Sequence, residues 1–244
     1  MKSAAKAMPG VLHQVRVTLL SEARIALATH PIEMNFADGA LFLEGEVANV
    51  AAKKLVLERA AAVTEVRGIV DRVRVAPAQA MEDGALRVAV CTVLLQEGAL
   101  AAYALRQWVK HDWEDIRIPP EPAGEILVEV RDGVVTLSGN VRGLGQKRLA
   151  GLLCWWVPGS RDVVNGLEVA PPEADNDAEI TDAVRLALEK DPFVDAGQVL
   201  VGTHGAVVTL RGQLPSAEQR DMAEFDAWYI FGVDRVINEI LVQV

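Results

Sequence analysis

The sequence repeats one pattern three times, and this repetition limits the possible folds more than any other feature. Each copy contains a turn, a short run of alternating apolar residues and a closing glycine, which is the order expected of a β-hairpin. An acidic or amide residue follows each closing glycine at an offset of 26 residues. An identical offset across a helix and a turn indicates a triplicated unit. The glycines and their later partners are Gly45 and Asp71, Gly139 and Asn165, and Gly212 and Asn238.

The three copies place the same types of element in the same order. After each glycine, apolar residues recur at helical spacing, as Leu149, Leu153 and Trp156 do in the second copy. A β-branched run typical of a strand follows, and a further helix precedes each hairpin. The sequence therefore predicts an α+β fold of three tandem small α-β-β-α-β units, each a three-stranded mixed sheet with two helices on one face.

Two short linkers divide the three copies, and both contain proline. The expected domains cover residues 8–76, 83–170 and 176–244. Helices are predicted to open the first and third domains at Val11–Ala28 and Ile180–Glu189, because apolar residues share one helical face in each and a proline follows each.

The second copy carries an insertion ahead of its hairpin. Its closing glycine lies 94 residues after the first one, whereas the third lies only 73 residues after the second, so about twenty residues are added. We predict that the added segment lengthens the leading helix, as Leu86–Leu95 followed by Ala99–Lys110. This leader is either one bent helix or two.

Several recurring residues are interpreted as shaping the backbone. Asp38-Gly39 and Asp132-Gly133 form two-residue turns that accept positive φ, and His204-Gly205 is expected to serve the third copy, with one extra residue before the glycine. Glycine suits a tight turn or a close approach, and an asparagine side chain can bond within its own turn. The full recurring set is Gly45, Gly139, Gly212, Gly159, Gly232, Asp71, Asn165 and Asn238.

These residues resemble the BON domain, a family found in bacterial osmotically induced and secretin-associated proteins. The hairpin motif Asp-Gly-Val-Val-Thr-Leu-Ser-Gly occupies residues 132–139, and the closing motif Gly-Val-Asp-Arg-Val-Ile-Asn occupies residues 232–238. The first copy departs from the closing motif at Glu65 and Asp71. The resemblance covers nearly the whole chain as three copies. It implies interaction modules, associated with phospholipid or envelope surfaces and with protein assembly, that share no catalytic residues.

Charge is distributed unevenly along the chain. The first 76 residues hold ten Lys/Arg and eight Asp/Glu, a net of +2, whereas residues 171–244 hold five and fourteen, a net of −9. The whole chain carries −10, so the basic footprint expected of a nucleic-acid-binding protein is absent. Ends of opposite sign can attract each other between molecules.

The sequence offers no constellation typical of catalysis, metal binding or cofactor binding. Its four histidines are scattered without partners at metal-ligand spacing, and no phosphate-binding glycine loop or nucleophile elbow occurs. Cys91 and Cys154 lie in apolar surroundings, which predicts buried and unreactive thiols. We expect no enzyme, no cofactor and no metal.

Five residues are candidates for contact with a partner or a lipid. Trp155 and Trp228 occupy the same offset from their glycines, at the margin of the apolar helix face, where they either contact a partner or pack one repeat against another. Basic residues cluster on the helix of the first copy, where they either form a solvated face or bind an anionic surface. These residues are Lys53, Lys54 and Arg59.

The sequence favours a non-enzymatic scaffold that self-associates or binds a protein partner. A peripheral phospholipid-binding protein of the stress or envelope-maintenance type is the alternative, and an enzyme or small-ligand carrier with its site between repeats is the least favoured. Neither a hydrophobic signal core nor a run of about 20 uncharged residues occurs, so we expect a cytoplasmic protein, with peripheral membrane association as a further option.

Overall fold

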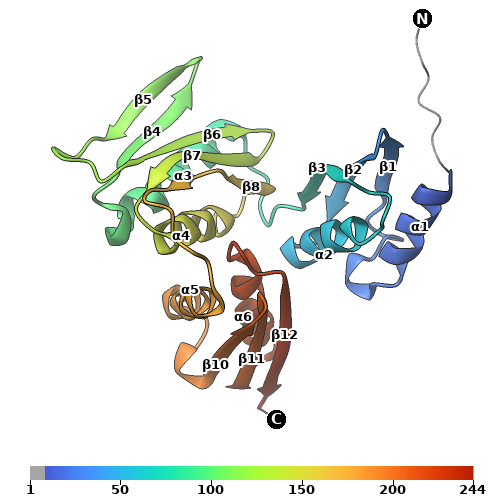
Figure 1. Cartoon of the computed structure of the whole chain (residues 1–244). Helices are drawn as coiled ribbons and strands as arrows, with labels where there is room; N and C mark the ends of the chain where they lie inside the picture. Colours follow the sequence, from blue (N-terminus) through green and yellow to red (C-terminus); the bar gives the residue numbers. More distant parts are fainter. Residues whose placement is uncertain (1–8, 244) are drawn as a thin grey trace, which may run out of the picture. The chain divides into compact units, whose positions relative to one another are not determined.

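The computed structural model describes residues 9–243, and the chain divides into two units, Met1–Ala76 and Pro77–Val244 (Figure 1). The first unit holds the first repeat, and the second unit holds the other two. The predicted α+β class and the repeated α-β-β-α-β order are confirmed in both units.

In the first unit, two helices cover one face of a three-stranded sheet (Figure 1). Strands β1 and β2 form an antiparallel hairpin, and β3 returns parallel to β2 after a helix. The predicted helix Val11–Ala28 ends early, at Leu20, and just beyond it the hydroxyl of Ser21 donates to the carbonyl of Thr18. The elements are α1 (Pro9–Leu20), the 3₁₀ helix η1 (Ala23–Ile25), β1 (Ile32–Ala37), β2 (Ala40–Val47), α2 (Val50–Ala61) and β3 (Gly68–Val75).

The second repeat is built on the larger sheet of the second unit. Its strand order is β5-β4-β6-β7-β8, and the short strand β9 also pairs with β7. Helices α3 and α4 pack on one face. The elements are α3 (Asp83–Gln96), η2 (Gly98–Leu100), β4 (Ala104–Val109), β5 (Asp112–Arg117), β6 (Glu125–Arg131), β7 (Val134–Val141), α4 (Leu144–Trp155), β8 (Asp162–Asn165) and β9 (Glu168–Val169).

The third repeat returns to the three-stranded plan of the first. Strand β11 is central, antiparallel to β10 and parallel to β12, and α5 and α6 pack on one face of this sheet. Helix α4 of the second repeat also contacts α5 and α6, so the two repeats share a helical interface. The elements are α5 (Asp177–Lys190), η3 (Ala196–Gln198), β10 (Val199–His204), β11 (Val207–Leu214), α6 (Ala217–Tyr229) and β12 (Arg235–Val242).

The insertion in the second repeat forms a β-hairpin, so the prediction of a helix at Ala99–Lys110 is wrong, and the central sheet has six strands where three were expected. Leu105 and Trp108 are spaced three residues apart, which also suits a helix. Pairing with a neighbouring strand makes this segment a strand, because Leu105 lies beside Ile126 in the parallel ladder between β4 and β6. The hairpin turns at Lys110 and His111, which adopt positive φ without any glycine.

The turn of the third hairpin is shifted by one residue from its predicted place. Gly205 and Ala206 have φ of 55° and 60°, whereas His204 is the last residue of β10 and pairs with Val207. The third hairpin therefore has no extra residue before its glycine. Ala206 occupies a conformation that asparagine, aspartate and glycine usually supply, which is why the pattern of residue types misplaced the turn.

Within residues 9–243, no helix combines the length and the apolar character needed to cross a membrane.

Candidate interaction surfaces

Each sheet has one face covered by helices and one face left open. Strand residues alternate between the faces, so Leu41 and Leu43 are buried while Phe42 between them is exposed. On the open faces, large apolar side chains remain in contact with solvent. These are Phe42 and Val70 in the first repeat, Trp113 and Val164 in the second, and Leu200, Ile237 and Leu241 in the third.

The third repeat has the most apolar open face. Leu200 and Leu241 are 72% and 69% exposed, and they lie on the two outer strands of this sheet. Between them, Arg211 of β11 pairs with Glu239 of β12 at 2.6 Å. Exposed leucines on the same face of one small sheet indicate a surface that another molecule could cover, because a group of exposed apolar side chains, unlike an isolated one, marks an interaction site.

The open face of the second repeat carries a pair of tryptophans on the inserted hairpin. Trp108 and Trp113 face each other across β4 and β5, with ring centres 5.1 Å apart and an edge-to-face angle of 63°. Arg106 on the same face pairs with Asp115 at 2.8 Å. The hairpin thus adds a pair of tryptophans, flanked by an ion pair, to the open face of the second repeat.

The recurring asparagines fasten a strand to the helix that precedes it. The side-chain amides of Asn165 and Asn238 donate to the carbonyls of Lys147 and Arg220, at 2.7 Å and 3.1 Å. Their side-chain oxygens accept the backbone N–H two residues further on. Each asparagine therefore satisfies polar groups on two elements at once.

The first repeat makes this connection with a different pair of residues. Asp71 replaces the asparagine and cannot donate, so the ammonium of Lys53 turns inward, pairs with Asp71 at 2.8 Å and donates to the carbonyl of Val73. Lys53 occupies the same offset from its glycine as Lys147 and Arg220 do from theirs. The ion pair between this lysine and this aspartate therefore replaces, as a unit, the asparagine contact of the other two repeats.

A family model of the BON domain matches three stretches of the chain, residues 16–77, 118–171 and 176–244. The chain belongs to the BON domain family. The three matched stretches correspond to three BON domains in tandem, as the hairpin and closing motifs predict. The inserted strands β4 and β5 lie just outside the second match, which begins at residue 118.

Two solved structures resemble the chain only weakly. Both are of CdsD, described as a structural protein of the type III secretion system of Chlamydia trachomatis, and each is 17% identical to this chain with a TM-score of 0.25. One alignment covers 96% of this chain and 92% of CdsD, and the other, of its C-terminal domain, covers 98% and 100%. No curated protein matches the sequence.

The two tryptophans that are candidates for partner contact or for packing between repeats both pack inside the second unit. Trp228 is fully buried, at 0% exposure, so it cannot touch a partner in this conformation, and its expected role is corrected. Trp155 at the end of α4 stacks on Tyr229 of α6, with ring centres 5.6 Å apart. This stack joins the second and third BON domains, which was the alternative interpretation.

The basic residues predicted on the first BON domain are also partly engaged. Lys53 is buried against Asp71, which corrects its expected role as a surface contact. Arg59 pairs with Glu22 at 3.0 Å, and Lys54 is half-buried. The basic helix face is thus less free to bind an anionic surface than the sequence suggests.

The Lys53–Asp71 pair gives a prediction for the first BON domain. Asp71→Asn introduces the amide of the other two domains but leaves the buried ammonium of Lys53 without its counter-charge, so we expect a loss of about 1–2 kcal/mol in stability. Lys53→Met in the same chain should restore at least half of the loss, because the new amide can then donate to the carbonyl of residue 53. Urea denaturation of the two variants measures this coupling, and additive losses would contradict it.

A second recurring contact was missed by the sequence interpretation. Asp83 at the start of α3 accepts the backbone N–H groups of Asp132 and Gly133, both at 2.9 Å. Asp177 at the start of α5 does the same for Gly205 and Ala206, and these two bonds lower the pKa of Asp177. The signal was present, since an aspartate opens both helices, but nothing in the sequence connects it with the hairpin turn it binds.

Arg148 anchors the interface between the second and third BON domains. Its side chain on α4 is buried, and it donates to the carbonyl of Phe231 at 2.9 Å and to Asp175 at 2.5 Å. Lys147 beside it lies 4.6 Å from the ring centre of Phe231. Because Asp175 belongs to the linker between the domains, one arginine holds the linker, the second domain and the third domain together.

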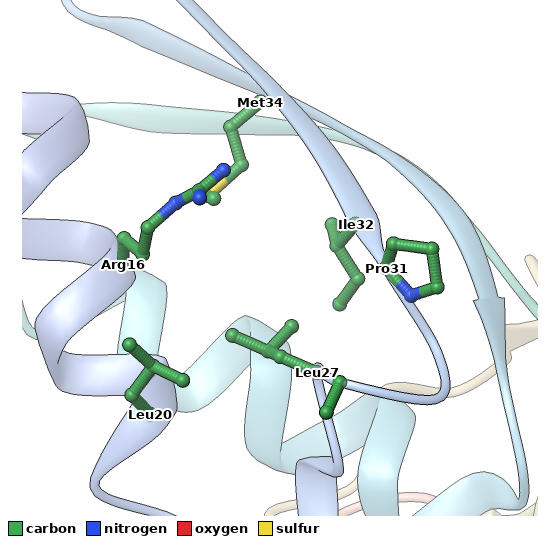
Figure 2. Close-up of a pocket in the computed structure, with 7 residues that line it drawn as sticks. Arg16, Leu20, Leu27, Pro31, Ile32 and Met34 are labelled. Atoms are coloured by element: carbon green, nitrogen blue, oxygen red, sulfur yellow. The ribbon is translucent and has the colours of Figure 1, made fainter.

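The first BON domain contains an apolar hollow of about 220 Å³ beside α1. Figure 2 shows Leu20 and Leu27 converging from one side and Pro31 and Ile32 from the other, with Arg16 extending towards Met34. The guanidinium of Arg16 has no hydrogen-bond or ion-pair partner among residues 9–243. An apolar hollow with a cation at its rim suits an amphiphile or an apolar side chain that has an acidic neighbour.

Both cysteines are buried, as predicted. Burial raises the pKa of Cys91 to about 11 and raises the pKa of Cys154 as well, so neither thiol forms a thiolate near neutral pH. In the part of the chain that the structure describes, no group of three or more metal-ligating side chains comes together.

Proposed function

We propose that this protein is a non-enzymatic scaffold whose three BON domains associate with further copies of the same chain. The observation that carries the proposal is the open sheet face of the third domain, where Leu200, Ile237 and Leu241 are exposed together. Burial of one leucine of this size is worth about 1.5–3 kcal/mol. Two or three of them can therefore drive association when a matching surface is present.

The charge distribution supports a head-to-tail arrangement. The first domain is basic and the third is acidic, and α1 of the first domain exposes Val17 and Leu20 beside Arg16. An apolar surface with a basic rim complements an apolar surface on an acidic domain. Contacts between unlike surfaces close into rings or extend as filaments.

Light scattering at about 50 mM and about 500 mM salt tests this proposal, because higher salt screens attraction between exposed charges. We expect an oligomer at low salt and a lower mass at high salt. The double variant Leu200→Glu/Leu241→Glu should be monomeric at both, whereas Val88→Glu, on α3 at a position that is 60% exposed, should behave as the unaltered chain does. A monomeric unaltered chain at both salt concentrations would remove the proposal.

Peripheral binding to phospholipid is the second candidate, and the hollow beside Arg16 favours it. An acyl chain could enter the apolar hollow while the guanidinium meets an acidic headgroup. Flotation with vesicles of zwitterionic lipid, with and without anionic lipid, tests it. Binding that needs anionic lipid and is lost in Arg16→Glu would support this function, and no flotation with either vesicle would remove it. In both cases the expected cytoplasmic location stays a prediction.

A further inference from the structure

A buried aspartate lies at the interface between the second and third BON domains. Asp226 on α6 is 3% exposed, yet it faces neighbouring helices from a position where the apolar pattern of α6 is interrupted. One of its oxygens accepts a hydrogen bond of 2.9 Å from the indole N–H of Trp156, which caps α4 in the second domain. An isolated carboxylate in such a place is costly, so its surroundings require an explanation.

The second oxygen of Asp226 receives no hydrogen bond from a donor group. Asp191, the residue that follows the end of α5, is 8% exposed, and its carboxyl lies within hydrogen-bonding reach of Asp226. Two carboxylates are both acceptors, so a hydrogen bond between them exists only when one carries a proton. Two buried carboxyls side by side, one of them with an oxygen that lacks a donor, are arranged to hold one proton, because neighbouring like charges in a buried site do not both ionise.

Among the residues that the structure describes, the groups around the pair supply no compensating positive charge. The nearest cation on α5, Lys190, is turned towards Glu97 at 2.8 Å, and Arg148 on α4 is held by Asp175. On α6 itself Tyr229 lies close, and Glu224 binds Asn238. Strands β11 and β12 present buried Val208, Leu210, Val236 and Ile240 to this helix.

The pKa of Asp226 agrees with this geometry. Burial raises it, the bond from Trp156 lowers it, and the charge of Asp191 and the bond to it raise it further, to about 8. The acid is therefore protonated in the folded chain at neutral pH but ionised in the unfolded chain. Stability that depends on this proton is present below about pH 4 and is lost as the pH rises towards about 8, because the folded state then binds more protons than the unfolded state.

We propose that Asp226 and Asp191 share a proton and act with Trp156 as a pH-sensitive clasp between the second and third BON domains. With the proton in place, the pair joins α5 to α6 and presents an acceptor to Trp156 from the neighbouring domain. Loss of the proton leaves two buried carboxylates facing each other and loosens the helical interface. The clasp acts within one chain and does not depend on self-association.

Asp226→Asn tests the clasp, because the amide keeps an acceptor for Trp156 and a permanent donor for Asp191. The urea midpoint of the unaltered chain should fall between pH 5 and pH 9, and that of the variant should stay nearly constant, so the variant is the more stable chain at pH 9. Hydrogen exchange at the end of α4 and along α6, compared between the two chains at the same pH, should be at least about tenfold faster in the unaltered chain at pH 9 and similar at pH 5.

A control variant and a second substitution make the outcome decisive. Asp221→Asn, at an exposed position on the same helix, should keep the pH dependence of the unaltered chain. If Asp226→Asn does not fold, Asp191→Asn serves instead, and it should flatten the same profile by removing the facing charge. Parallel pH profiles for the unaltered chain and either clasp variant would overturn the proposal.

Discussion

Gly212→Ala should destabilise the third BON domain by about 3 kcal/mol or more. Gly212 closes the hairpin of β10 and β11 with a φ of 142°, a value that residues with a side chain rarely adopt. A Cβ atom there would also overlap the carbonyl oxygen of Gln198, which is backbone and cannot turn away. The strand would have to shift, and the alternation that buries Val208 and Leu210 would shift with it.

The matched control for this prediction is Gly205→Ala in the turn of the same hairpin. Gly205 also has a positive φ, of 55°, but no atom lies within 4 Å of the added carbon, so the expected cost is only about 1 kcal/mol. Urea denaturation followed by circular dichroism measures both variants. Equal losses at the two positions would show that close approach to Gln198 contributes nothing.

Trp228→Ala should cost about 3–5 kcal/mol, the range measured when a large buried aromatic side chain is removed. Trp228 has no exposed surface, and its indole N–H bonds to Glu224 at 3.3 Å on the same helix. Removing it leaves a cavity in the core of the third domain, beside the helices that contact the second domain. The loss should therefore appear as lower stability of the isolated chain, measured by denaturation without any partner present.

Trp113→Ala is the matched control for the tryptophan prediction. Trp113 lies on the inserted hairpin with 37% of its surface exposed and contacts Trp108 edge to face, so its removal should cost no more than about 1 kcal/mol. If Trp113→Ala destabilises the chain as much as Trp228→Ala does, the assignment of Trp228 to the core and of Trp113 to the surface is wrong.

The candidate site could be predicted only in part. The alternation along the strands implies that one face of each sheet is open. Leu200 and Leu241 can be assigned to that face from their positions in this alternation. Trp155 and Trp228 share one offset from their glycines, so their pattern is identical, yet one stacks on Tyr229 and the other is fully buried. A tryptophan at the margin of an apolar helix face can be covered by a partner protein or by a neighbouring domain. Its position in the sequence does not distinguish the two, because both would cover the same helix face.

The polar residues inside the interface were still harder to predict. Asp226 interrupts an apolar helix face, and a lone sequence offers no way to know that Asp191 and Trp156 meet it from two other helices. Lys53 belongs to a basic cluster by sequence, but its counter-charge, Asp71, comes from a strand 18 residues later. Whether a charged side chain is buried depends on a partner from another element, and sequence periodicity carries no information about that partner.

By itself, the sequence determined the threefold repetition, the order of helices and strands and the glycines that close each hairpin, because these follow from local backbone preferences and from short-range apolar periodicity. Tertiary structure alone decided that the insertion adds two strands, that Trp228 and Lys53 are internal, and that the buried Asp226 of the third domain meets Trp156 of the second. Each of these outcomes depends on contacts between residues distant in the chain, whose energies outweigh local preference.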